Sequence, residues 1–220
     1  QIALNPQKAN LALRQMLQEV RADVLSNAEI KSVIKEGNQI SIVELNRGEF
    51  YKAKHFIDCT VNAELAQFAG VRKLRGFETF GLPDSELSVT LTFQTKGLTV
   101  DRLKRIEYEY LAGFVDKSNN QFQRLLNVAA GNNSEFADYL RQDLVDKNGN
   151  LKTMYAGKDY IDVRSKALSI AYHSFRGTPL SLQTSGSILD NGNIAILNDN
   201  TLSWNALLFD VNAEQAENLA

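Results

Sequence analysis

The feature that most constrains the fold lies between residues 53 and 71, where an apolar strand pattern passes directly into a helix pattern. Asp58 and Thr60 form a polar turn after the strand, and small residues then continue to Gly70, where a left-handed helix C-cap is expected. Such a joint packs a helix against strands, which favours a mixed fold. A helix N-terminus after a strand also offers N–H groups to an anion, although a plain structural joint has the same pattern.

Upstream of this joint, the sequence predicts one helix and an antiparallel meander. Residues 8–20 carry apolar side chains at helical spacing. Three strand-like runs follow, joined by Gly37-Asn38 and Asn46-Arg47-Gly48, which are typical of tight turns. We place the strands at residues 23–34, 40–45 and 50–58, and a closing helix at 63–69.

A domain boundary is expected where the periodic pattern ends, between residues 72 and 85. This stretch contains Gly76, Gly81 and Pro83, which interrupt regular structure. We therefore predict one domain at residues 1–75, built from a helix, a β-meander and a strand–turn–helix joint. The second domain is expected at residues 76–220.

The second domain is expected to hold a mainly antiparallel sheet covered by three helices, so the whole chain is predicted to be α+β. Clean alternation predicts a half-buried strand at 88–95. We place the helices at 99–111 (capped by Thr99 and ended by Gly113), 121–130 and 134–145. The remaining strands are expected at 161–174, 180–189, 194–198 and 202–211, with a hairpin turn at 190–193 and a short helix after Asn212, which has Gln215 as capping partner.

Charge and cysteine content exclude several classes of function. Lys and Arg number 24 against 26 Asp and Glu, for a formal net charge of -2, so no basic surface for nucleic acid or an anionic membrane is expected. The apolar stretches are too short to span a bilayer, which needs about 20 residues. The single cysteine, Cys59, excludes an internal disulfide and fits a reducing cytoplasm. We expect a cytoplasmic protein.

Residues for direct catalysis or metal binding are sparse. The two histidines, His55 and His173, fall in predicted strands far apart in the sequence, so no metal site is predicted. Cys59 has no Cys or His partner at a useful spacing, and we interpret it as a small buried thiol. The sequence identifies no catalytic residue.

Aromatic and guanidinium side chains gather in the last third of the chain and suit a pocket for a planar ligand. Arg164 and Tyr172 are the candidate substrate-binding residues. The alternative is that the aromatics are core residues or cross-strand pairs. The set comprises Tyr155, Tyr160, Tyr172, Phe175 and Trp204 with Arg164 and Arg176.

Residues 53–70 read Ala-Lys-His-Phe-Ile-Asp-Cys-Thr-Val-Asn-Ala-Glu-Leu-Ala-Gln-Phe-Ala-Gly. The segment resembles Ala-Lys-x-x-Ile-Asp-Ala-Thr-Gly-Asp-x-x-Leu-Ala-x-x-Ala-Gly, a motif of FAD-dependent oxidoreductases among the two-dinucleotide-binding-domain flavoproteins. The resemblance implies that this turn lies against FAD, with Asp58 and Thr60 contributing to the site and the backbone of Ile30 meeting the adenine. It covers residues 11–71 and extends loosely to residue 97, similar to the first strand of the family's substrate-side domain.

The chain departs from the family pattern at two points. Val61 stands where the motif has glycine, and the Gly-x-Gly-x-x-Gly fingerprint is absent from these 220 residues. The resemblance then implies a middle segment of a flavoenzyme: part of its FAD domain plus a substrate-type domain. Its partners would be a small-molecule substrate and the remainder of the parent flavoprotein. We expect the segment alone to be inactive and not to retain FAD.

Two alternatives stay open. A non-catalytic ligand-binding or interaction domain on a flavoprotein-derived scaffold would also explain Val61 and the missing fingerprint. An unrelated α+β domain that carries the motif by chance is the second.

Overall fold

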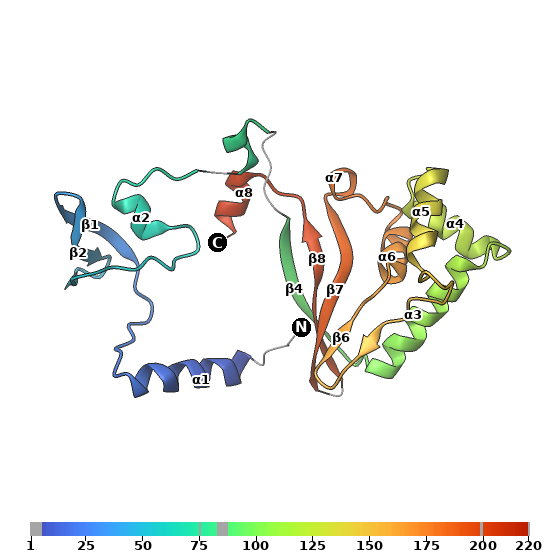
Figure 1. Ribbon diagram of the computed structural model, residues 1–220, viewed down its shortest axis with the longest axis horizontal. Helices are drawn as coiled ribbons and strands as arrows, with labels where there is room; N and C mark the ends of the chain where they lie inside the picture. The colour runs from blue at the N-terminus through green and yellow to red at the C-terminus, as the bar shows by residue number, and fades with distance from the viewer. Residues whose placement is uncertain (1–5, 75, 83–87, 199, 220) are drawn as a thin grey trace. The chain divides into compact units, whose positions relative to one another are not determined.

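The computed structural model describes residues 6–219 apart from 75, 83–87 and 199. It combines helices with antiparallel sheets, which confirms the predicted α+β class (Figure 1). The chain divides into two compact units. The smaller unit holds residues 10–86 and 211–220, and the larger unit holds residues 87–210 together with 1–9.

The smaller unit contains the predicted three-stranded antiparallel meander, in the order β1-β2-β3, although its first strand begins at Ile30 and not at residue 23. The third strand ends at Lys52, so residues 53–58 and His55 among them lie outside it, contrary to the prediction. The α8 capping box between Asn212 and Gln215 is confirmed. The elements are β1 (Ile30–Glu36), β2 (Gln39–Leu45), β3 (Phe50–Lys52), α2 (Glu64–Phe68), the 3-10 helix η1 (Phe77–Phe80) and α8 (Ala213–Asn218), together with most of α1 (Pro6–Glu19), whose first residues are assigned to the larger unit.

A small core joins the meander to α2. Val43 and Leu45 are buried on alternate positions of β2, as expected for a strand with one covered face. Leu65 from α2 completes this cluster, and Ile30 and Phe56 pack against it. The apolar side chains of α1, by contrast, are not buried.

The larger unit is built on a five-stranded antiparallel sheet in the order β4-β8-β7-β6-β5. One face carries a cross-strand row of apolar residues in which Phe93, Trp204 and Ile194 are successive partners. The rings of Phe93 and Trp204 stack with centroids 5.8 Å apart. The strands are β4 (Val89–Lys96), β5 (Tyr155–Ala156), β6 (Tyr160–Asp162), β7 (Ser187–Asn198) and β8 (Thr201–Phe209).

Helices gather on one side of this sheet, as Figure 1 shows for α3 to α6. Leu111 and Phe114 from α3, Leu126 from α4, Leu140 from α5 and Ile170 from α6 are fully buried in one cluster. The predicted helices and the Thr99 N-cap are confirmed. The helices are α3 (Val100–Val115), α4 (Asn120–Ala129), α5 (Ser134–Asp143), α6 (Ala167–Arg176) and α7 (Leu182–Ser185).

The strand predicted at residues 161–174 is wrong, because most of this stretch forms helix α6. Ala167, Ile170, Ala171 and Ser174 are buried at spacings of three and four residues, which places one side of a helix in the core. His173 is consequently a buried helix residue and not a strand residue.

The strand predicted at 180–189 and the hairpin turn at 190–193 are also wrong. Residues 182–185 form helix α7, and β7 continues through residues 190–193 with an irregular register against β8. Gly113 does not end α3 either, since the helix continues to Val115. A Cβ at Gly113 would lie 2.6 Å from Cγ of Phe122, so the glycine permits close packing.

Candidate functional site

The turn between β3 and α2 is organised by the side chains of Asp58 and Thr60. One oxygen of Asp58 accepts hydrogen bonds from the backbone N–H of Thr60 at 2.9 Å and from its hydroxyl at 2.7 Å. The other oxygen accepts from the N–H of Ala66 at 2.9 Å. The Thr60 hydroxyl in turn accepts from the N–H of Glu64 at 2.7 Å. Two side chains before the helix therefore satisfy N–H groups of its first turn.

The hydrogen bonds fix the charge state of Asp58. The Thr60 hydroxyl, the Thr60 N–H and the Ala66 N–H lower the pKa of the Asp58 carboxyl, because each donates to its charged form. Asp58 is thus an ionised residue that shapes the turn, and Thr60 links it to α2.

The backbone at position 61 does not itself demand the glycine of the family motif. Val61 is outside the left-handed region, which Ala63 adopts instead with a φ of 54°. A glycine at position 61 is therefore not required for the conformation of this turn. Val61 and Ile57 are strongly exposed, at 84% and 86%, and so is Cys59, contrary to the buried thiol predicted from sequence.

Ile30 lies in the same unit as the turn. It is the first residue of β1, is half-buried, and packs against the cluster that includes Leu65 of α2. Leu65 is adjacent to Ala66, whose N–H donates to Asp58. The three residues implied by the resemblance are therefore connected through helix α2.

Arg164 and Tyr172 engage different partners. The Arg164 Nε donates to Asp162 at 3.3 Å, and its guanidinium lies 5.2 Å from the ring centroid of Tyr155. The Tyr172 hydroxyl accepts from Arg176, whose guanidinium also lies over the tyrosine ring at 5.2 Å. Each half of the predicted pocket is thus a separate aromatic–guanidinium pair.

A row of polar residues crosses the sheet on the face opposite the apolar row. Thr92 of β4 pairs with Asn205 of β8, Asn205 with Asn193 of β7, and Asn193 with Asp162 of β6. Directly opposed residues in antiparallel strands share a face, so these side chains form one line that ends beside Arg164. The row offers hydrogen-bond donors and acceptors to a polar ligand.

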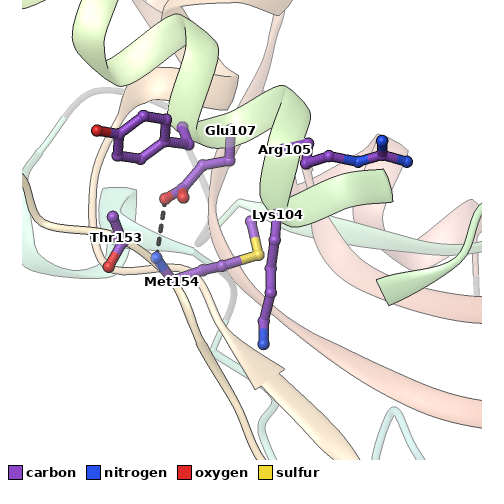
Figure 2. A pocket seen from close by; sticks show the side chains of 6 residues that line it. Lys104, Arg105, Glu107, Thr153 and Met154 are labelled. Atoms are coloured by element: carbon purple, nitrogen blue, oxygen red, sulfur yellow. Dashed lines mark hydrogen bonds between the residues drawn. The ribbon is translucent and has the colours of Figure 1, made fainter. Parts of the chain in front are cut away.

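Sequence reasoning missed Glu107, a buried carboxyl in the larger unit. It lies on α3, is 1% exposed, and accepts a hydrogen bond from the backbone N–H of Met154 at 3.0 Å (Figure 2). Burial raises the pKa of Glu107 to about 7, against a smaller opposing effect of the Met154 N–H. Its position four residues after Leu103 and four before Leu111, on the apolar stripe of the helix, is the sequence signal that identifies it.

Replacing Glu107 with glutamine is expected to remove a pH dependence of stability. The pKa of Glu107 is higher in the folded state, so its contribution is most favourable below about pH 4.5 and is lost as pH rises through about 7. At pH 8, Glu107→Gln should raise the free energy of unfolding by about 1–3 kcal/mol, and near pH 4 the two proteins should be equal. Urea titrations across this pH range measure the difference. Glu109→Gln, an exposed control on the same helix, should track the wild type; equal pH profiles for all three proteins would contradict the prediction.

In the part of the chain that the structure describes, no helix is long and apolar enough to cross a membrane. No group of three or more His, Cys, Asp or Glu side chains within the same residues is arranged to hold a metal ion.

One comparison with known proteins gives a match. The model of a family described as FAD dependent oxidoreductase matches residues 2–185, which include the Asp58 turn, Glu107 and the Arg164 pair. Comparison with curated proteins and with solved structures finds no match.

Proposed function

This chain belongs to the family of FAD-dependent oxidoreductases, and on that premise we propose that it supplies two parts of a flavoenzyme. Residues 1–75 would be part of the FAD-binding domain, and residues 76–220 would be the substrate-side domain. The observation that carries the proposal is the ordered Asp58–Thr60–Ala66 turn in the segment that resembles the family's FAD motif.

The residues of the turn fit a cofactor contact. Both carboxylate oxygens of Asp58 accept hydrogen bonds from N–H groups within the turn. Asp58 would therefore position the backbone of the turn and would not itself bind the cofactor. Thr60 and the exposed residues beside it would face FAD, and Ile30 would present its backbone to the adenine. When bound, FAD supplies the redox chemistry, and the protein binds and orients it.

The substrate is proposed to be a small polar molecule bound on the polar row of the larger unit. Arg164 is its best candidate ligand, because the guanidinium is about half exposed beside Asp162 and Tyr155. The Tyr172–Arg176 pair on α6 is a separate second candidate for contact with the substrate. A catalytic base is not part of the proposal.

We further propose that the remainder of the parent flavoprotein covers the apolar side chains of α1. Leu13, Met16 and Leu17 are 60%, 62% and 40% exposed, which is unusual for one face of an amphipathic helix. A cytoplasmic location is proposed on the basis of Cys59, an exposed thiol without a disulfide.

The absorption spectrum of the purified full-length protein tests the proposed function. We expect a bound-flavin band that survives desalting, and a 220-residue chain that is colourless after incubation with FAD and desalting. Bleaching of the band by a reductant and its recovery in air would establish redox activity. A full-length protein that never takes up FAD would reject the proposal and favour the non-catalytic binding domain.

A further inference from the structure

Helix α3 and the segment before β5 line an open pocket that the proposed flavin site does not use. Its volume is about 420 Å³, within the usual range for small-molecule sites. Figure 2 shows the Glu107 carboxylate directed at Thr153 and Met154, where one of its oxygens meets the Met154 N–H. The pocket is lined by Lys104, Arg105, Glu107, Tyr108, Thr153 and Met154.

The buried acid is the unusual part of this pocket. Leu103 and Leu111, one helical turn away on each side, are fully buried apolar residues, and a third apolar residue would ordinarily stand between them. A carboxylate at such a position is costly because burial removes its hydration, which the hydrogen bond of 3.0 Å from the Met154 N–H offsets in part. Buried acids with a shifted titration at a pocket are candidates for a functional role.

The lining has the chemistry of an anion site. Lys104 and Arg105 carry positive charge, and Tyr108 and Thr153 carry hydroxyl groups. Glu107 is the one acid among the six lining residues, and with a proton bound it becomes a hydrogen-bond donor as well. Figure 2 shows neither cation directed at the Glu107 carboxylate: Lys104 extends along the side chain of Met154, and Arg105 points to the other side of α3. Because Lys104 runs beside a lining residue of the pocket, it is expected to matter more than Arg105.

We propose that this pocket binds a small carboxylate, which Glu107 recognises in its protonated form while Lys104 supplies positive charge. Two carboxyl groups at one site share a proton, because both cannot be ionised at close range. Binding therefore takes up one proton above neutral pH. The inference stands independently of flavin binding, because the pocket lies within a single unit.

The electrostatic surroundings are consistent with proton-coupled binding. The raised pKa of Glu107, about 7, keeps much of it protonated near neutral pH. On the neighbouring segment, Lys152 is paired with Asp143 at 3.0 Å. On α6, His173 contacts the Thr178 hydroxyl at 3.1 Å, and burial followed by the charge of Arg176 lowers its pKa.

Benzoate is a suitable probe, and the Met154 amide is the reporter. We expect the Met154 amide resonance to follow the titration of Glu107 and to shift saturably with benzoate. Above pH 7 the affinity should fall about tenfold per pH unit, as one bound proton requires. Calorimetry at pH 7.5 in two buffers of different ionisation enthalpy should give an uptake of up to one proton.

Three variants separate the proposal from non-specific binding. Glu107→Gln keeps a hydrogen-bond donor without a titrating group, so its benzoate affinity should not change between pH 6 and 8.5. Lys104→Ala, at an exposed position, should weaken binding more than Arg105→Ala does, and Glu109→Gln should match the wild type. The proposal is wrong if benzoate gives no saturable shift, if Glu107→Gln keeps the wild-type pH dependence, or if benzylammonium binds instead with proton release.

Discussion

Replacing Gly192 with alanine is expected to lower the free energy of unfolding by about 2–3 kcal/mol. Gly192 is buried in β7, and a Cβ there would lie 2.7 Å from Cα of Ala206 and would also overlap the Ala206 Cβ and the Asn205 carbonyl oxygen. Backbone atoms of β8 cannot move aside as the end of a long side chain can. A loss of stability would itself indicate the close contact, because Gly→Ala at an unstrained position raises the free energy of unfolding by about 0.4–1 kcal/mol.

Chemical denaturation of the Gly192→Ala protein measures this effect, with an unchanged m-value as evidence that the denatured state is the same. Gly157→Ala is the matched control, because a Cβ at Gly157 would approach the ring of Tyr160 at 3.0 Å and no closer. The double variant with Ala206→Gly should recover part of the loss, since it removes one of the overlapping atoms. A Gly192→Ala protein as stable as the wild type would show that β7 does not approach β8 so closely.

Gly192 also shows why the hairpin turn predicted at residues 190–193 was wrong. The run Asp190-Asn191-Gly192-Asn193 has the composition of a hairpin turn, and local turn propensity alone predicts one. In the folded protein the glycine permits a close approach of two strands at an irregular point of their register. Composition does not distinguish a tight turn from a close approach, because glycine serves both.

Helix α6 shows a second case in which local sequence does not decide between a strand and a helix. Its sequence contains Ile170 and the aromatic residues Tyr172 and Phe175, which suit a strand. Ala167, Ile170 and Ala171 nevertheless also fit one side of a helix. The choice depends on the packing of Ile170 with Leu111 and Leu126, which are far away in the sequence. The meander and the capped helices were predictable because turn and cap residues act locally.

Some residues of the candidate site could likewise be predicted from local sequence, and others depend on contacts between distant parts of the chain. Asp58 and Thr60 were identified from a strand–turn–helix pattern and a motif, both local in sequence. Glu107 was missed because its significance depends on burial between Leu103 and Leu111 and on contact with Met154, 47 residues later. An acid on the apolar stripe of a helix is the pattern that would have identified it.

Asp58→Ala is expected to lower the affinity of the full-length protein for FAD by about tenfold or more. The substitution removes the acceptor of three hydrogen bonds, so the N–H groups of Thr60 and Ala66 lose their partner and the turn reorganises. Thr60→Ala should have a smaller effect, because the Asp58 contacts with the Thr60 N–H and Ala66 remain. Thr60→Ser keeps the hydroxyl and should bind FAD as the wild type does.

Asp116→Ala is the matched control for a general effect of breaking an Asp-centred turn. Asp116 accepts from the N–H and the hydroxyl of Ser118, as Asp58 does from Thr60, and its pKa is lowered by the same kind of hydrogen bonds. This turn lies in the other unit, so its loss should leave the FAD affinity unchanged. Flavin fluorescence titration of the apoprotein compares the four variants. Equal losses of FAD affinity in Asp58→Ala and Asp116→Ala would mean that the Asp58 turn has no specific role in cofactor binding. A loss of FAD affinity in Asp58→Ala and Thr60→Ala alone would assign that role to the turn.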